Sequence, residues 1–139
     1  KLDSYIQALM QFDIVVPKEA IIENKINSLD DIAACLDNHF SLNKMMPDVI
    51  ICNNDEQAIA VAAWVRSKNL RIPEDIAIIG FNDSAIAKFQ LPPIASVARE
   101  DDKMVDAAVR MLFARLQNSQ MPQQREVIAM KFVWRESAG

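Results

Sequence analysis

The segment PDVIICNNDEQAIAVAAWVRSKNLRIPEDIAIIGFND, residues 47–83, contains two short apolar runs separated by a helical pattern. Pro47 precedes the first run and Pro73 the second, and each run ends in polar residues. Between the runs, alanine-rich apolar positions recur at helical spacing. A strand, a helix and a second strand within about 30 residues are typical of a right-handed βαβ unit. The segment therefore predicts parallel strands that are buried on both faces.

Further helices and strands are predicted on both sides of this unit. Helical spacing of apolar residues indicates helices at residues 1–12, 28–40 and 100–116. Shorter extended segments indicate strands at residues 20–23, 96–97 and 126–134. The predicted fold class is α/β, with a mostly parallel sheet flanked by helices.

The composition of the chain narrows the class of partner. Its 139 residues include 15 Lys and Arg against 19 Asp and Glu, a formal net charge of −4. The basic residues are scattered, whereas a protein that follows a phosphate backbone needs a basic stripe. No apolar run reaches the roughly 18 residues of a membrane span. We therefore expect a cytoplasmic protein, without membrane contact, that binds a small molecule or another protein surface.

The usual signatures of catalysis are missing from the sequence. The single histidine, His39, has no Ser or Cys partner in a nucleophilic motif. With two glycines in the chain, neither a dinucleotide-binding loop nor a P-loop fits. No His, Cys or carboxylate cluster has the spacing of a metal site. The sequence predicts a protein that is not an enzyme and that holds no metal or cofactor.

Polar clusters follow both strands of the βαβ unit, at Asn53–Glu56 and at Phe81–Ser84. In an open parallel sheet, ligands bind just beyond the carboxyl ends of the strands. Amides and carboxylates there can pair with hydroxyl groups, which suits a sugar. The alternative is structural: Asn54 or Asp55 caps the following helix, and Asn82 and Asp83 form a turn.

Five motifs in order make the sequence similar to a known family. An apolar strand ends in Asn-Asp, an Ala-rich helix leads into an L-x-I-P-x-D linker, and the next strand ends in G-F-N-D. A Pro-Pro segment and a terminal V-x-R-E-S follow. This order resembles the effector-binding core of the LacI/GalR family of bacterial transcription regulators. The quoted motifs lie at residues 54–55, 69–75, 80–83, 91–93 and 133–137.

The resemblance implies a larger, two-lobed protein of periplasmic-binding-protein-like fold. An effector binds between the lobes, a homodimer forms, and an N-terminal helix-turn-helix absent from this chain binds operator DNA. Residues 1–98 are then the C-terminal lobe, residues 99–120 pack on the absent N-terminal lobe, and residues 121–139 return as the final strand and tail. The implied function is effector sensing and dimerisation in a DNA-binding transcription regulator, a repressor, that responds to a sugar or sugar-derived metabolite. The alternative is a periplasmic sugar-binding protein of a transport system.

The resemblance also implies effector-binding residues. Lys1 stands where relatives have Arg, Asn82 where they have Asp, and Ile26 near an aromatic residue that stacks on the ligand. The full set implied is Lys1, Ile26, Asn54, Asp55, Asn82 and Arg99.

Three of these positions depart from the family pattern. Lys1 lacks the bidentate fork of Arg, and Ile26 offers no stacking face. Asn82 replaces a charged acceptor by a neutral amide. Because the cations Lys1 and Arg99 both lie near the implied site and position 82 carries no acid, we expect the effector to be an acidic or phosphorylated sugar rather than a neutral one.

Overall fold

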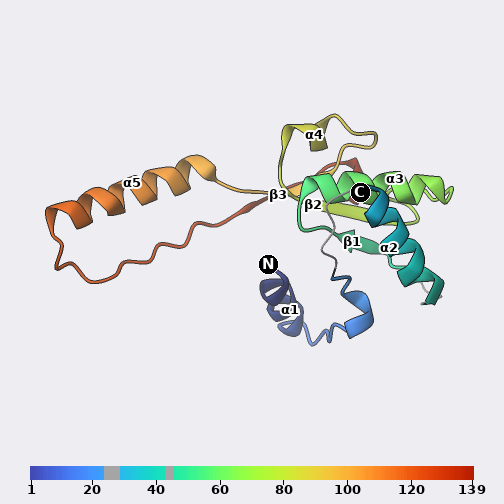
Figure 1. Ribbon diagram of the computed structural model, residues 1–139, viewed down its shortest axis with the longest axis horizontal. Coiled ribbons are helices and arrows are strands. Elements are labelled where there is room, and N and C mark those ends of the chain that lie inside the picture. The colour runs from blue at the N-terminus through green and yellow to red at the C-terminus, as the bar shows by residue number, and fades with distance from the viewer. Residues whose placement is uncertain (24–28, 43–45) are drawn as a thin grey trace.

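The computed structural model of the chain describes residues 1–23, 29–42 and 46–139. The described part confirms the predicted α/β class. Its four-stranded sheet has the order β1-β2-β3-β4 (Figure 1). β1, β2 and β3 are parallel, and β4 is antiparallel to β3. The strands are β1 (Val49–Ile51), β2 (Ala77–Asn82), β3 (Ala95–Ala98) and β4 (Lys131–Val133).

The core lies between β2 and the helices α2 (Leu29–Leu42) and α3 (Asp55–Ser67). Ile76 and Ile78 are almost completely buried against the alanine-rich face of α3. Burying an isoleucine side chain is worth about 1.5–3 kcal/mol relative to leaving it exposed. Trp64 of α3 is buried in this core, and its ring stacks on that of Phe40 from α2 with the centroids 5.5 Å apart. The βαβ unit predicted from residues 47–83 is therefore the centre of the fold.

The first strand of that unit, β1, is an edge strand. Val49 and Ile51 are 41% and 47% exposed, and no described segment pairs with the outer edge of β1. The prediction that β1 is buried on both faces was therefore wrong. An apolar run alone cannot distinguish a central strand from an edge strand whose neighbour is absent.

The N-terminal segment packs loosely beside the sheet. Helix α1 (Leu2–Met10) has no buried residue, although it carries the predicted apolar face. The strand expected at residues 20–23 does not form: the 3-10 helix η1 (Lys18–Ala20) ends there, and Ile21 to Glu23 are irregular. These residues form no ladder with β1, whose outer edge stays unpaired in the described part of the structure.

Helix α5 (Asp101–Gln117) extends away from the sheet and the chain returns alongside it, as Figure 1 shows on the left. We call residues 101–130 the arm. Arg110 Nη2 joins its two halves by contacting Glu126 Oε2 at 3.1 Å. The extended strand expected at residues 126–134 pairs with the sheet only at Lys131–Val133.

Two short elements complete the structure. Helix α4 (Ala85–Lys88) follows β2, and the 3-10 helix η2 (Glu136–Ala138) lies at the end of the chain. None of the described helices is long and apolar enough to cross a membrane.

Candidate functional site

The carboxyl ends of β1 and β2 meet at one edge of the sheet, and Lys1 lies there. Its Nζ donates a hydrogen bond to the backbone oxygen of Asn53, just beyond β1, at 2.8 Å. The same Nζ is 3.9 Å from the centroid of the Phe81 ring, near the end of β2. The structure thus brings a cation from the first residue of the chain to both strand ends.

Asn82 is the last residue of β2 and pairs in register with Ala98 of β3. Its side chain is half-buried, and its backbone φ is +100°, in the left-handed half of conformational space. Asp83 follows with φ +55°. Non-glycine residues rarely adopt positive φ, although Asn and Asp tolerate it best. The second strand therefore ends in an abrupt turn that carries the Asn82 amide.

Asn54 caps helix α3. Its Oδ1 accepts the backbone N–H of Gln57 at 2.8 Å, which satisfies one of the free donors at the start of the helix. The structural alternative considered for this residue is thus observed. Binding an effector through the amide nitrogen of Asn54 remains compatible with the cap, because the cap uses only the oxygen.

Asp55 is completely buried and holds the strand ends together. Its Oδ1 accepts the hydroxyl of Ser96 at 2.6 Å, and its Oδ2 accepts the backbone N–H of Ser84 at 2.6 Å. The expected effector contact by Asp55 does not fit this structure, because both carboxylate oxygens are occupied and none of the residue's surface is accessible.

The close approach of Asp55 explains the glycine at position 80. Gly80 lies within β2, and a Cβ built there would overlap Asp55 Oδ1 and lie 3.2 Å from Asp55 Cγ. Gly80 therefore makes room for a buried carboxylate two residues before the turn at Asn82.

The backbone of Arg99 lies at the same edge of the sheet as Asn82, because Ala98 before it pairs in register with Asn82. Its side chain is exposed and turns toward the start of the arm, with Nε 3.2 Å from Asp101 Oδ1. Among the described contacts, none joins the Arg99 side chain to Lys1 or Asn82. Ile26 lies outside the described residues.

The sequence analysis missed the groups that fix the turn after β2. Asp83 pairs with Arg135 across 52 residues, and Ser96 donates to Asp55. Ser137 joins two strands, since its hydroxyl donates to Ile78 O at 2.6 Å and accepts Ala95 N–H at 2.8 Å. The only sequence signal was the terminal R-E-S motif, which carries Arg135 and Ser137 but does not name their partners.

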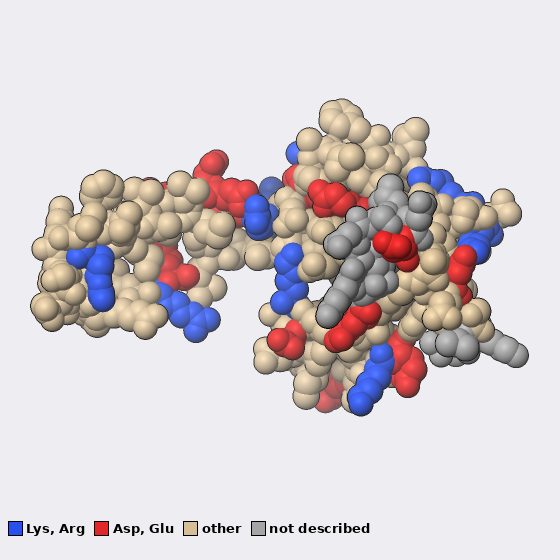
Figure 2. All heavy atoms as spheres, viewed as in Figure 1, with Lys and Arg blue, Asp and Glu red and all other residues tan. Residues whose placement is uncertain are grey.

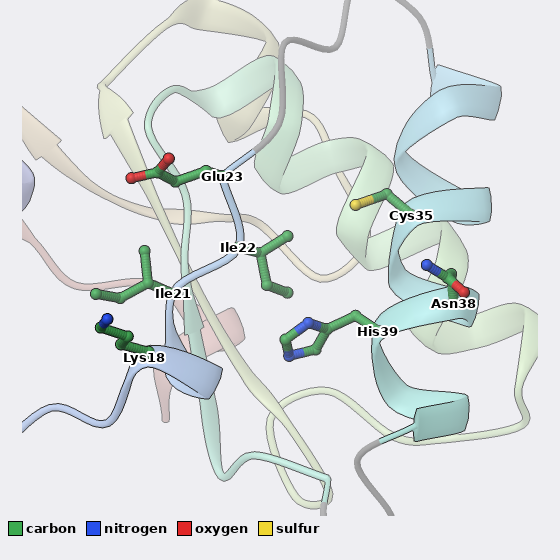
Figure 3. Close-up of a pocket in the computed structure, with 7 residues that line it drawn as sticks. All are labelled: Lys18, Ile21, Ile22, Glu23, Cys35, Asn38 and His39. Carbon is green, nitrogen blue, oxygen red and sulfur yellow. The ribbon is translucent and has the colours of Figure 1, made fainter.

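A separate hollow of about 630 Å³ lies between α2 and the segment at residues 18–23. In Figure 3 the His39 ring and the Cys35 sulfur point from α2 toward Ile22 on that segment. Of the predicted effector-binding residues that the structure describes, none lines it. Within the described residues, no three His, Cys, Asp and Glu side chains are grouped as metal ligands.

The buried thiol near the strand ends has no acidic character. Burial raises the pKa of Cys52 to about 12, and the charge of Asp55 contributes to the rise. The thiol is therefore protonated at neutral pH and a poor nucleophile.

Residues 7–138 match the periplasmic binding protein-like domain family. The chain is 32% identical over 95 residues to the lactose operon repressor of Rhizobium radiobacter, which covers 68% of this chain and 83% of that protein. It is 25% identical over 130 residues to the transcriptional repressor PurR of Pasteurella multocida, covering 94% of this chain and 38% of that repressor. The chain thus spans well under half the length of PurR.

The chain is also similar to solved structures of transcription regulators. The transcription regulator GntR of Chromobacterium violaceum superposes with a TM-score of 0.79 at 27% identity, covering 99% of this chain and 50% of that one. The cellobiose complex of the regulator CelR superposes with a TM-score of 0.82 at 24% identity, covering 99% of this chain and 41% of that one. The chain belongs to the periplasmic binding protein-like domain family and is an effector-binding fragment of a LacI/GalR-family regulator.

Proposed function

We propose that this chain is the effector-sensing and dimerising part of a DNA-binding transcription repressor that responds to a sugar-derived metabolite. One observation carries the proposal: Lys1 lies between the carboxyl ends of β1 and β2, next to the turn that holds Asn82. Ligands of open parallel sheets bind at such ends. One lobe supplies a single wall of the effector site, and the second lobe closes it.

Helix α5, within residues 99–120, belongs to that second lobe in the longer protein. Its exposed apolar side chains support this assignment, because an uncovered face of several large residues rarely stays in water. The exposed fractions are Val105 60%, Val109 46%, Leu112 57%, Phe113 59% and Leu116 71%. Residues 1–98 and the tail then form one lobe, and residues 99–120 cross to the other.

The longer protein acts as a homodimer. Ile86, Phe89 and Leu91, in and after α4, are 50%, 83% and 81% exposed and so present apolar surface to solvent. Such a surface supports contact with a second copy.

Operator DNA is bound through a helix-turn-helix outside this chain. Figure 2 supports the assignment of DNA binding to another part of the protein, because Lys and Arg on the visible face are interspersed with Asp and Glu and form no basic stripe. The regulator works in the cytoplasm and performs no catalysis. The alternative of a transporter's periplasmic sugar-binding protein shares the fold, but the relatives named above are regulators.

The effector is an acidic or phosphorylated sugar. Lys1 supplies a cation at the strand ends, and Asn82 removes the negative charge that an Asp would place there. Hydrogen bonds to charged groups are worth about 1.5–3 kcal/mol, against roughly 1 kcal/mol for neutral pairs. A phosphate or carboxylate therefore gains more from this site than a hydroxyl does.

Isothermal titration of the full-length regulator tests the effector class. D-glucose 6-phosphate is compared with D-glucose, and D-gluconate with D-glucose, at one ionic strength. We expect the acidic member of each pair to bind at least tenfold more tightly, a difference of about 1.4 kcal/mol. Asn82→Asp is expected to reverse the preference. Tighter binding of D-glucose by the unsubstituted regulator would contradict the proposed class.

A further inference from the structure

The turn after β2 is held in a conformation that its residues do not favour. Asn82 has φ +100°, beyond the small left-handed region that Asn tolerates, and Asp83 has φ +55°. Such conformations persist only where surrounding contacts impose them. The contacts that hold this turn therefore decide where the Asn82 amide points.

Two backbone contacts fix the turn from below. Ser96 Oγ accepts the Asp83 N–H at 3.0 Å, and Asp55 Oδ2 accepts the Ser84 N–H at 2.6 Å. Both acceptors are completely buried. These bonds fix the backbone after Asn82 but leave the Asp83 side chain unrestrained.

Arg135 restrains that side chain. Its Nη2 pairs with Asp83 Oδ1, and the two side chains are only 13% and 18% exposed. Nη1 of the same guanidinium donates a hydrogen bond to the backbone oxygen of Ile94 at 2.7 Å. Lys88 also approaches Asp83, but at 3.6 Å and with half of its side chain exposed. Arg135 is thus the principal partner of the Asp83 carboxylate.

The tail that carries Arg135 is itself fixed to the sheet. Ser137, two residues later, joins Ile78 O and Ala95 N–H through its buried hydroxyl, and its own N–H bonds Pro93 O at 3.1 Å. Because the tail is bonded to the sheet and Nη1 of Arg135 is bonded to Ile94 O, movement of the turn away from the tail would break the contact between Arg135 and Asp83.

We infer that Arg135 is a positioning residue for the effector site: it fixes the strained turn at Asn82 and Asp83 and so directs the Asn82 amide. The inference rests on the proposed function only for the statement that Asn82 faces the effector. The mechanical part, in which Arg135 maintains the positive φ of Asn82, stands on the contacts alone.

A double-mutant cycle between Arg135→Gln and Asn82→Gly tests it on the 139-residue chain. Glycine accepts φ +100° without strain, so Asn82→Gly should raise the thermal midpoint when Arg135 holds the turn. Once Arg135→Gln releases the turn, the same glycine should give little or no increase. Equal increases in both backgrounds would show that Arg135 only adds stability, and would overturn the inference.

A second measurement reads the turn directly. The ³J(HN–Hα) coupling of Asn82, which depends on φ, should change in Arg135→Gln and in Asp83→Asn, and remain unchanged in Arg125→Gln, which removes an exposed arginine from the arm. Arg135→Lys, which keeps the charge but replaces the two guanidinium NH2 groups by one ammonium, should give an intermediate value. An unchanged coupling in folded Arg135→Gln or Arg135→Lys would overturn the inference.

None of these measurements uses an effector. Additive effects therefore remove the positioning role whichever sugar binds, and failure of the sugar titration removes only the proposed effector class.

Discussion

Gly80 is the residue whose role in the structure is most directly testable. Its missing Cβ leaves room for the Asp55 carboxylate, which is completely buried and bonded to Ser96 and Ser84. We expect Gly80→Ala to lower the free energy of unfolding by about 1–3 kcal/mol, as overpacking does in other cores. Urea denaturation measures the change.

The matched control for Gly80→Ala is the same substitution in an Asp55→Ala background. Removing the carboxylate relieves the overlap, so the additional loss caused by Gly80→Ala should become smaller. A Gly80→Ala chain as stable as the unsubstituted one would refute the packing role of the glycine.

At single positions, the sequence located the candidate site but could not choose between roles. Asn54 and Asp55 are adjacent at a strand end, and both types are common in caps and in ligand contacts. Asn54 proved to be a cap, and Asp55 a buried support for another strand's turn. The difference arises from Ser84 and Ser96, which approach Asp55 from 29 and 41 residues away and leave no local signal.

At the level of elements, the arm should control self-association of the isolated chain. Val105, Val109, Leu112 and Leu116 recur at helical spacing on one exposed face of α5. We expect the chain to form oligomers at high concentration, as measured by light scattering, because association covers this face.

The double variant Leu112→Glu/Leu116→Glu should shift the chain toward monomer. Gln117→Glu, which adds an acid on another face of the same helix, serves as the control and should leave association unchanged. A monodisperse monomer of the unsubstituted chain at high concentration would disprove the role of the arm.

The elements that were predicted correctly from the sequence are those that pack on each other within this chain. α3 and β2 pack on each other, and their apolar patterns identified both. β1 was expected to be buried and the segment at residues 20–23 to be a strand, yet the outer edge of β1 is unpaired in the described structure and Ile21 to Glu23 join no strand. An apolar pattern indicates that a segment is suited to burial, but it does not show which strand or helix covers the segment. A segment without such a neighbour becomes an edge strand or remains unpaired.

At the scale of the whole molecule, the structure has a well-packed sheet domain and two poorly covered parts, α1 and the arm. This distribution suits one lobe of a two-lobed protein. It also fits the proposed function, in which a single lobe provides one wall of an interlobe site and the other lobe completes its shape.

We propose that the effector binds at the carboxyl ends of β1 and β2, in a site that favours negative charge. Residue-resolved NMR of the ¹⁵N-labelled chain, titrated with D-glucose 6-phosphate and separately with D-glucose, tests it most directly. We predict weak, saturable shifts in the amides of Asn53, Phe81 and Asn82 with the phosphorylated sugar, and smaller shifts with glucose. Shifts centred on Lys18 and His39 instead, or larger shifts at the strand ends with glucose, would contradict it.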